Sequence, residues 1–186
     1  MRAFLVTCFA IASFISAVGQ NAAPSFLAYV HVIQVDPAQN GGIDACVIVG
    51  VDGQYRYEVS PPVGEPLSHT RVYLGRLPGE AFARFKSLVH ARELRGIASS
   101  SQPHGSLLAS RNYETISLRI LREGETQEIV FTSVDGRNQM PAALTSFIPW
   151  MKSLQKSLGK PDRRATRRGC SGLDATPDFT PQLQKR

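Results

Sequence analysis

Residues 46–59 read CVIVGVDGQYRYEV, and this stretch predicts a β-hairpin. Its first half is apolar and rich in β-branched residues, and in its second half aromatic and polar residues alternate. Alternation places one set of side chains on one face of a strand. Asp52–Gly53 stands between the halves and is a preferred pair for a two-residue type I′ turn, because both central positions need a positive φ. The stretch therefore predicts two antiparallel strands joined by a tight turn.

Further strands are predicted on both sides of this hairpin, where β-branched residues recur between turn residues. They cover residues 29–35, 71–77, 114–122 and 126–131. Two segments carry apolar residues at helical spacing, one opening at Pro78–Gly79 and one ending at Leu158. This order predicts an α+β fold: an antiparallel sheet of about five to six strands with two amphipathic helices packed on one face.

The second helix contains Pro149, and a proline in the interior of a helix destabilises it by ~3 kcal/mol. With Ser146 as N-cap, Pro149 becomes the third helical residue, where a backbone N–H has no partner within the helix. We therefore expect this helix to begin at Phe147.

The first 19 residues predict an export signal peptide. Arg2 precedes an uncharged apolar run over residues 3–15, and small residues at 17–19 suit cleavage after Gly19. The run is shorter than the roughly 20 residues that a bilayer-spanning helix needs. We expect an exported chain, periplasmic or extracellular, with no transmembrane span after cleavage. An uncleaved N-terminal anchor is the alternative.

The charge of the remaining chain is unevenly distributed. Residues 20–159 carry 13 Lys and Arg against 12 Asp and Glu, whereas residues 160–186 carry seven against three. The apolar period also stops at residue 160, which predicts a single α+β domain over 20–159 and a basic disordered tail over 160–186. Charge on a tail, together with export, argues against a nucleic-acid partner. An anionic lipid or polysaccharide of the cell envelope could instead bind the tail arginines, Arg163, Arg164, Arg167 and Arg168.

Two cysteines remain after signal cleavage, Cys46 in the hairpin and Cys170 in the tail. In an oxidising compartment they could form a disulfide that closes a loop of more than 100 residues, worth ~4 kcal/mol in the chain-entropy model. The alternative is that the two are not bonded, with Cys46 a small buried strand residue and Cys170 a mobile thiol.

No motif in the sequence indicates catalysis, a cofactor or a metal. His90 and Glu93 are three residues apart on one predicted helical turn, but the sequence offers no further ligand of the kind that zinc requires. No serine lies between a strand and a helix as a nucleophile elbow requires, and no glycine-rich phosphate loop precedes a helix. We therefore expect a non-catalytic binding or interaction module. A hydrolase would need His31 or His90 beside a serine and a carboxylate.

Two other surfaces are candidates for binding. Tyr55 and Tyr57 share a strand face and could stack on a sugar or peptide, or could instead be cross-strand partners buried under a helix. A different class of function is a secreted inhibitor of, or partner to, an extracellular protein. Such a protein would insert the Pro61–Pro62 loop or the Ser99–His104 linker into its partner.

Several short motifs follow one another in a recognisable order: a cysteine that opens a strand, an Asp-Gly-x-Tyr hairpin, and two motifs on later strands. They are Cys46, Asp52–Gly53 with Tyr55, Gly75 with Leu77, and Thr115–Ile116 with Leu118. Over residues 41–158 this order resembles an uncharacterised domain found in exported bacterial proteins and lipoproteins. The family often has proline after its first cysteine, where this chain has Val47. The resemblance implies a fold and a compartment, since the family has no assigned activity.

Overall fold

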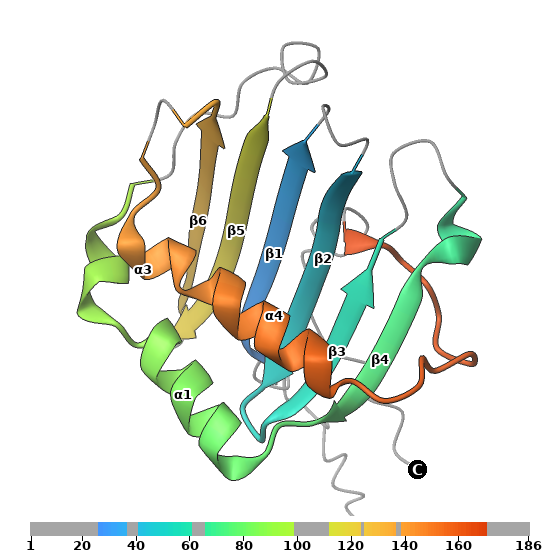
Figure 1. The fold of residues 1–186 in the computed structure, drawn as a ribbon. Helices are drawn as coiled ribbons and strands as arrows, with labels where there is room; N and C mark the ends of the chain where they lie inside the picture. The colour runs from blue at the N-terminus through green and yellow to red at the C-terminus, as the bar shows by residue number, and fades with distance from the viewer. Residues whose placement is uncertain are drawn as a thin grey trace, which may run out of the picture.

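A computed structural model describes residues 26–36, 41–60, 66–98, 112–123, 125–136 and 139–170. These residues form one antiparallel sheet with helices on one face (Figure 1). The strands are β1 (Phe26–Asp36), β2 (Gly41–Gly50), β3 (Gln54–Val59), β4 (Arg71–Arg76), β5 (Tyr113–Arg122) and β6 (Glu125–Val134). The helices are α1 (Gly79–Val89), α3 (Ala142–Thr145) and α4 (Phe147–Ser157), with 3₁₀ turns η2 (Leu67–His69) and η3 (Arg92–Gly96). The predicted α+β class is confirmed.

The strand order across the six-stranded sheet is β4-β3-β2-β1-β5-β6. The first four strands form a meander, each pairing with the next. The chain then crosses the sheet through α1, and β5 pairs with the other side of β1 before β6 completes the sheet. Strand β1 is therefore central, and β4 and β6 are the two edges.

The loop between β2 and β3 differs from the expected type I′ turn. The Gly53 N–H donates to the Gly50 carbonyl over 3.0 Å, and Gly53 has a φ of 81°, whereas Asp52 does not have a positive φ. This is the pattern of a three-residue hairpin loop closed by a left-handed glycine. The Gln54 backbone N–H donates to the Asp52 carboxylate over 3.0 Å, and this hydrogen bond lowers the pKa of Asp52 against the opposing effect of burial. Asp52–Gly53 marked the turn correctly, but the turn type was wrong.

The main core lies between the helices and the sheet. Phe85 of α1 stacks on Trp150 of α4, with ring centroids 4.5 Å apart, and meets Phe147 edge-on at 6.4 Å. The sheet side of this core consists of apolar residues at alternate strand positions, including Val30, Val32, Val47, Val49, Ile116, Leu118, Ile120 and Ile129. Both predicted amphipathic helices thus pack on the same face of one sheet. Within the described residues, every helix is too short or too polar to cross a membrane.

Ser146 occupies the N-cap position of α4, as predicted, but its side chain does not cap the helix. Its backbone is helical, and its hydroxyl donates to the Ala142 carbonyl over 2.9 Å. The short helix α3 precedes α4 directly, so the serine side chain bonds back to the preceding turn instead of capping the next one. Pro149 is nevertheless the third residue of α4, as predicted.

Candidate functional site

After α4 the chain stays with the domain instead of leaving it as a tail. Residues 158–170, here called the strap, pass the edge strand β4 and end on the sheet face opposite the helices (Figure 1). The Asp162 N–H donates to the Val72 carbonyl of β4 over 2.7 Å, and Cys170 at the far end is fully buried. The prediction of a disordered tail is therefore wrong for residues 160–170. The rest of the predicted tail, 171–186, and the predicted signal peptide lie outside the described residues.

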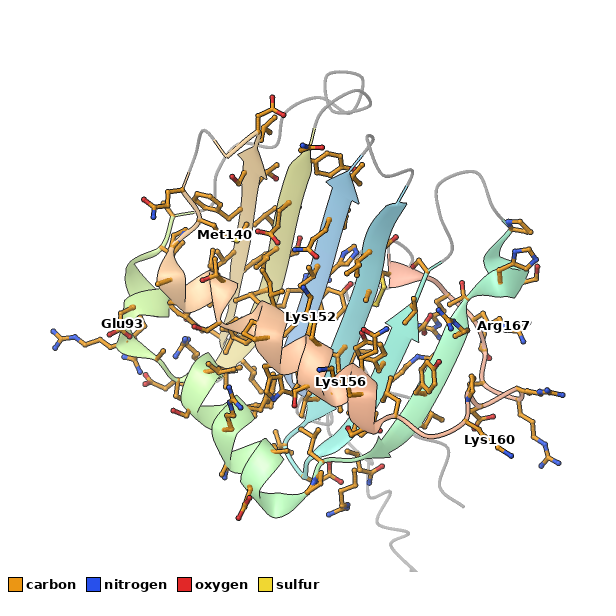
Figure 2. The ribbon with its side chains drawn as sticks, in the orientation of Figure 1. Glu93, Met140, Lys152, Lys156, Lys160 and Arg167 are labelled. Atoms are coloured by element: carbon orange, nitrogen blue, oxygen red, sulfur yellow. A yellow bond between two sulfur atoms is a disulfide. The ribbon has the colours of Figure 1, made fainter. Side chains whose placement is uncertain are left out.

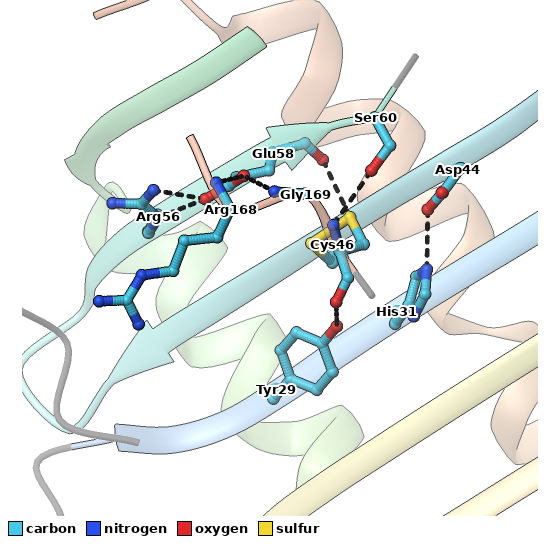
Figure 3. Close-up of a disulfide and its surroundings, with 10 residues drawn as sticks. Tyr29, His31, Asp44, Cys46, Arg56, Glu58, Ser60, Arg168 and Gly169 are labelled. Atoms are coloured by element: carbon cyan, nitrogen blue, oxygen red, sulfur yellow. Dashed lines mark hydrogen bonds and ion pairs between the residues drawn. A yellow bond between two sulfur atoms is a disulfide. The ribbon is translucent and has the colours of Figure 1, made fainter. Parts of the chain in front are cut away.

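Cys170 forms a disulfide with Cys46 of β2, with the two Cα atoms 5.6 Å apart and a sequence separation of 124. The Tyr29 hydroxyl donates to the Cys170 carbonyl over 3.2 Å, and the Cys170 N–H donates to the Ser60 hydroxyl over 3.0 Å (Figure 3). Both cysteines belong to a second, small buried cluster with Phe26, Tyr29 and Ile48. Of the two arrangements considered for the cysteines, the structure has the bonded one.

Glu58 of β3 is a fully buried carboxylate that holds the end of the strap. Its Oε2 accepts the N–H groups of Gly169 at 3.0 Å and Arg168 at 3.4 Å, and its Oε1 accepts the Arg56 guanidinium at 2.6 Å (Figure 3). Gly169 has a φ of 68°, a conformation that suits glycine and lets successive N–H groups converge on one anion. Arg56 also donates to the Thr166 carbonyl of the strap. A charge this deeply buried is tolerated because donors surround it.

The strap and α4 together expose seven basic side chains, which we call the basic ridge. They are Lys152, Lys156, Lys160, Arg163, Arg164, Arg167 and Arg168. In Figure 2, Lys152 and Lys156 lie along α4, and Lys160 and Arg167 lie on the strap. The only acid between residues 139 and 170 is Asp162, which accepts the Arg164 backbone N–H over 2.8 Å. Within the described chain, no ion pair neutralises any of the seven.

The four arginines of this ridge were predicted from the sequence to form a binding surface, but its three lysines were not. The lysines recur every four residues, from Lys152 through Lys156 to Lys160, and this spacing was the signal that could have identified them. It could not show that α4 and the strap are continuous on the surface, because this depends on the anchors at Val72 and Cys170.

Of the two roles considered for Tyr55 and Tyr57, the structure has the buried one, so the prediction that they form a binding surface is wrong. They face the helices and are 9% and 1% exposed. Tyr57 meets Tyr73 edge-on with ring centroids 6.2 Å apart. Burial raises the pKa of Tyr55, and burial together with the neighbouring Tyr73 hydroxyl raises the pKa of Tyr57 to about 12. Both rings belong to the main core. Alternate residues of a strand lie on the same face of the sheet, and Tyr55 and Tyr57 occupy positions of β3 that face α1 and α4.

His31 lies beside a carboxylate on the strap side of the sheet. Its Nε2 is 2.8 Å from Asp44 Oδ1, and the side chain is 2% exposed. Its cross-strand neighbours are Cys46 on β2 and Ser117 on β5. Ser117 lies within a strand that is paired on both sides, so no nucleophile elbow is present there and the adjacent backbone N–H groups are held in the ladders. The arrangement therefore lacks the oxyanion-binding groups that acyl transfer requires.

Two hollows of ≈ 590 and ≈ 600 Å³ share Glu114, Ser133 and Gly136, at one end of β5 and β6. The Gln34 amide donates to the Glu114 carboxylate, so the acid that the two hollows share already has a partner. The Pro61–Pro62 loop and the Ser99–His104 linker, proposed for the inhibitor hypothesis, lie outside the described residues. That hypothesis stays a prediction.

No family model matches this chain, and no curated protein matches it. The resemblance to a domain of exported bacterial proteins therefore stays a prediction, and the function must be inferred from the geometry of the basic ridge.

Proposed function

We propose that this protein is an exported, non-catalytic module that binds an anionic polymer of the cell envelope along its basic ridge. One observation carries the proposal. Seven exposed cations lie on a helix and a strap that are fixed to the domain at both ends of the ridge, by the packing of α4 and by the Cys46–Cys170 disulfide.

Fixing the strap in advance lowers the entropic cost of binding. A disordered segment loses roughly 1–2 kcal/mol of backbone entropy for each residue that becomes ordered on a ligand. Here the disulfide and the Glu58 hydrogen bonds have already ordered the strap. More of the attraction between the ridge and an anion therefore remains as net affinity.

The ligand that suits this ridge carries repeated negative charges. Each exposed cation contributes only ~1 kcal/mol near an anionic surface, and salt screens it beyond about 8–10 Å. Useful affinity therefore requires several simultaneous contacts. Lys152 and Lys156 lie one helical turn apart, ~6 Å along α4, and the strap arginines extend the row. A polymer with regularly spaced anionic groups can engage these sites together.

The test measures binding of a heparin fragment, as a model anionic polysaccharide, to the oxidised chain that begins at residue 20. Four strap substitutions remove part of the ridge: Arg163→Gln, Arg164→Gln, Arg167→Gln and Arg168→Gln. At ~1 kcal/mol for each of the four cations, we expect the affinity to fall roughly 100- to 1,000-fold, and the affinity of the unsubstituted chain to fall as salt is raised.

A matched control removes four exposed charges from α1 and η3 instead: Arg84→Gln, Lys86→Gln, Arg92→Gln and Arg95→Gln. Its net charge equals that of the strap variant, and we expect less than about a threefold loss because these residues lie outside the ridge. Equal losses in the two variants would show that net charge alone drives binding. Tighter binding to vesicles of anionic lipid than to the polysaccharide would contradict the choice of a polymer.

A further inference from the structure

Four side chains with metal-binding chemistry meet where the strap is anchored, on the face opposite the helices. The donor atoms of His31, Asp44 and Cys170 all lie within 4.8 Å of one another. Cys46 is a fourth member, because its sulfur is bonded to that of Cys170 and its backbone is paired with that of His31. The proposed binding of an anionic polymer uses none of these side chains as a ligand contact.

We propose that, when the Cys46–Cys170 disulfide is reduced, these four side chains bind a zinc ion. A dithiol reductant supplies two electrons and two protons, the S–S bond breaks to give two thiols, and the dithiol becomes a disulfide. Zn²⁺ then displaces both thiol protons to solvent and is held by two thiolates, an imidazole nitrogen and a carboxylate oxygen. The bonded and the zinc-bound forms are thus mutually exclusive states of one site.

The distances suit a tetrahedral ion after a small adjustment. Zinc bonds of ~2.0–2.3 Å place neighbouring ligand atoms about 3.3–3.8 Å apart. His31 Nε2 and Asp44 Oδ1 are hydrogen-bonded at 2.8 Å. With the imidazole proton on Nδ1, zinc takes the place of this hydrogen bond without release of a third proton, and the two atoms move apart by about half an ångström. Breaking the S–S bond lets the sulfurs separate from ~2.05 Å to ~3.8 Å.

The donor set and its surroundings favour zinc over calcium or magnesium. Two thiolates and an imidazole are soft or borderline ligands, whereas the alkaline-earth ions prefer oxygen. Both cysteines are fully buried and His31 is 2% exposed, while the Asp44 side chain is 30% exposed and leaves a route for the ion. Tyr29 and Ser60 hold the Cys170 backbone by hydrogen bonds that do not depend on the disulfide.

The experiment uses the chain from residue 20 reduced with a non-chelating phosphine in the absence of oxygen, and Co²⁺ as a spectroscopic probe for zinc. We expect one equivalent of cobalt to produce thiolate-to-cobalt charge-transfer bands and the intense visible bands of a tetrahedral site, and one equivalent of zinc to abolish them. The oxidised chain should give neither signal. Absence of a saturable one-to-one signal from the reduced chain would overturn the proposal.

Variants separate this site from adventitious thiol binding. We expect Asp44→Asn and His31→Gln to weaken metal affinity at least about tenfold, and the surface controls His90→Gln and Glu93→Gln to leave it unchanged. The thermal unfolding midpoint of the reduced chain, measured with and without zinc, provides a second readout. It still reports zinc binding if reduction lowers the stability of the domain. Zinc should raise the unfolding midpoint of the unsubstituted chain and of both controls, and should raise that of Asp44→Asn by less. Equal affinity and equal stabilisation in Asp44→Asn would overturn the proposal.

Discussion

Removal of the Cys46–Cys170 disulfide should destabilise the domain by an amount that follows from its place in the chain. The two residues are separated by 124 positions, and a loop of this length restricts the unfolded chain by ~4.9 kcal/mol in the chain-entropy model. The perturbation is the double variant Cys46→Ala with Cys170→Ala, which leaves no free thiol in the chain from residue 20. We expect its free energy of unfolding to be lower by about 4–5 kcal/mol.

Urea denaturation followed by tryptophan fluorescence measures this loss. Trp150 is the only tryptophan and is 3% exposed between α1 and the sheet, so its emission reports on the main core. With an m value of about 1–3 kcal/mol/M, the expected loss lowers the midpoint by roughly 1–5 M. The unsubstituted chain reduced without metal should lose a similar amount. A loss below about 1 kcal/mol in both samples would refute the view that the disulfide holds the strap against the sheet.

Two further predictions concern buried ionisable groups. Tyr57 has a pKa raised to about 12, so the unfolded chain releases this proton first, and stability should fall by roughly 1.4 kcal/mol per pH unit between about pH 10 and 12. Tyr57→Phe should flatten that decline in urea titrations at alkaline pH, and an unchanged slope would contradict this assignment. Glu58→Gln should cost about 3 kcal/mol by thermal or urea unfolding, because it leaves the Arg56 charge without its buried partner. The exposed-pair control Glu123→Gln should change stability by no more than about 0.5 kcal/mol, and similar effects in both variants would count against a special role for Glu58.

The fold could be predicted because its main determinants are local. Alternation of apolar residues identified the strands, and the helical spacing around Phe85 and Met151 identified the faces that pack on the sheet. The turn type was wrong because Asp-Gly also fits a three-residue loop, in which only Gly53 needs a positive φ. Ser146 was placed correctly at the start of α4, but its side chain does not cap that helix because α3 immediately precedes it.

The candidate site was predictable only in part, because its geometry depends on contacts between distant segments. The strap has no apolar period, and its order comes from the disulfide and from a single buried carboxylate, Glu58, more than 100 residues earlier in the chain. The pairing of His31 with Asp44 depends on the β1–β2 register, which residue spacing alone does not specify. By contrast, the pairing of the two cysteines could be considered from the sequence alone, since only two remain after the predicted cleavage of the signal peptide.

Non-reducing peptide mapping of the protein recovered after secretion decides whether one disulfide holds the basic strap across the sheet, and whether the predicted signal peptide has been removed. Cleavage after Lys and Arg should yield residues 20–56 cross-linked to residues 169–185, because no Lys or Arg lies within either segment before its last residue. We expect the cross-linked pair to have the summed mass of the two peptides less two hydrogens, with Gln20 as the first residue. Reduction should separate the two peptides. Recovery of either cysteine as a free thiol would show that the disulfide does not hold the strap, and a peptide that begins before Gln20 would show that the predicted signal peptide is not cleaved after Gly19.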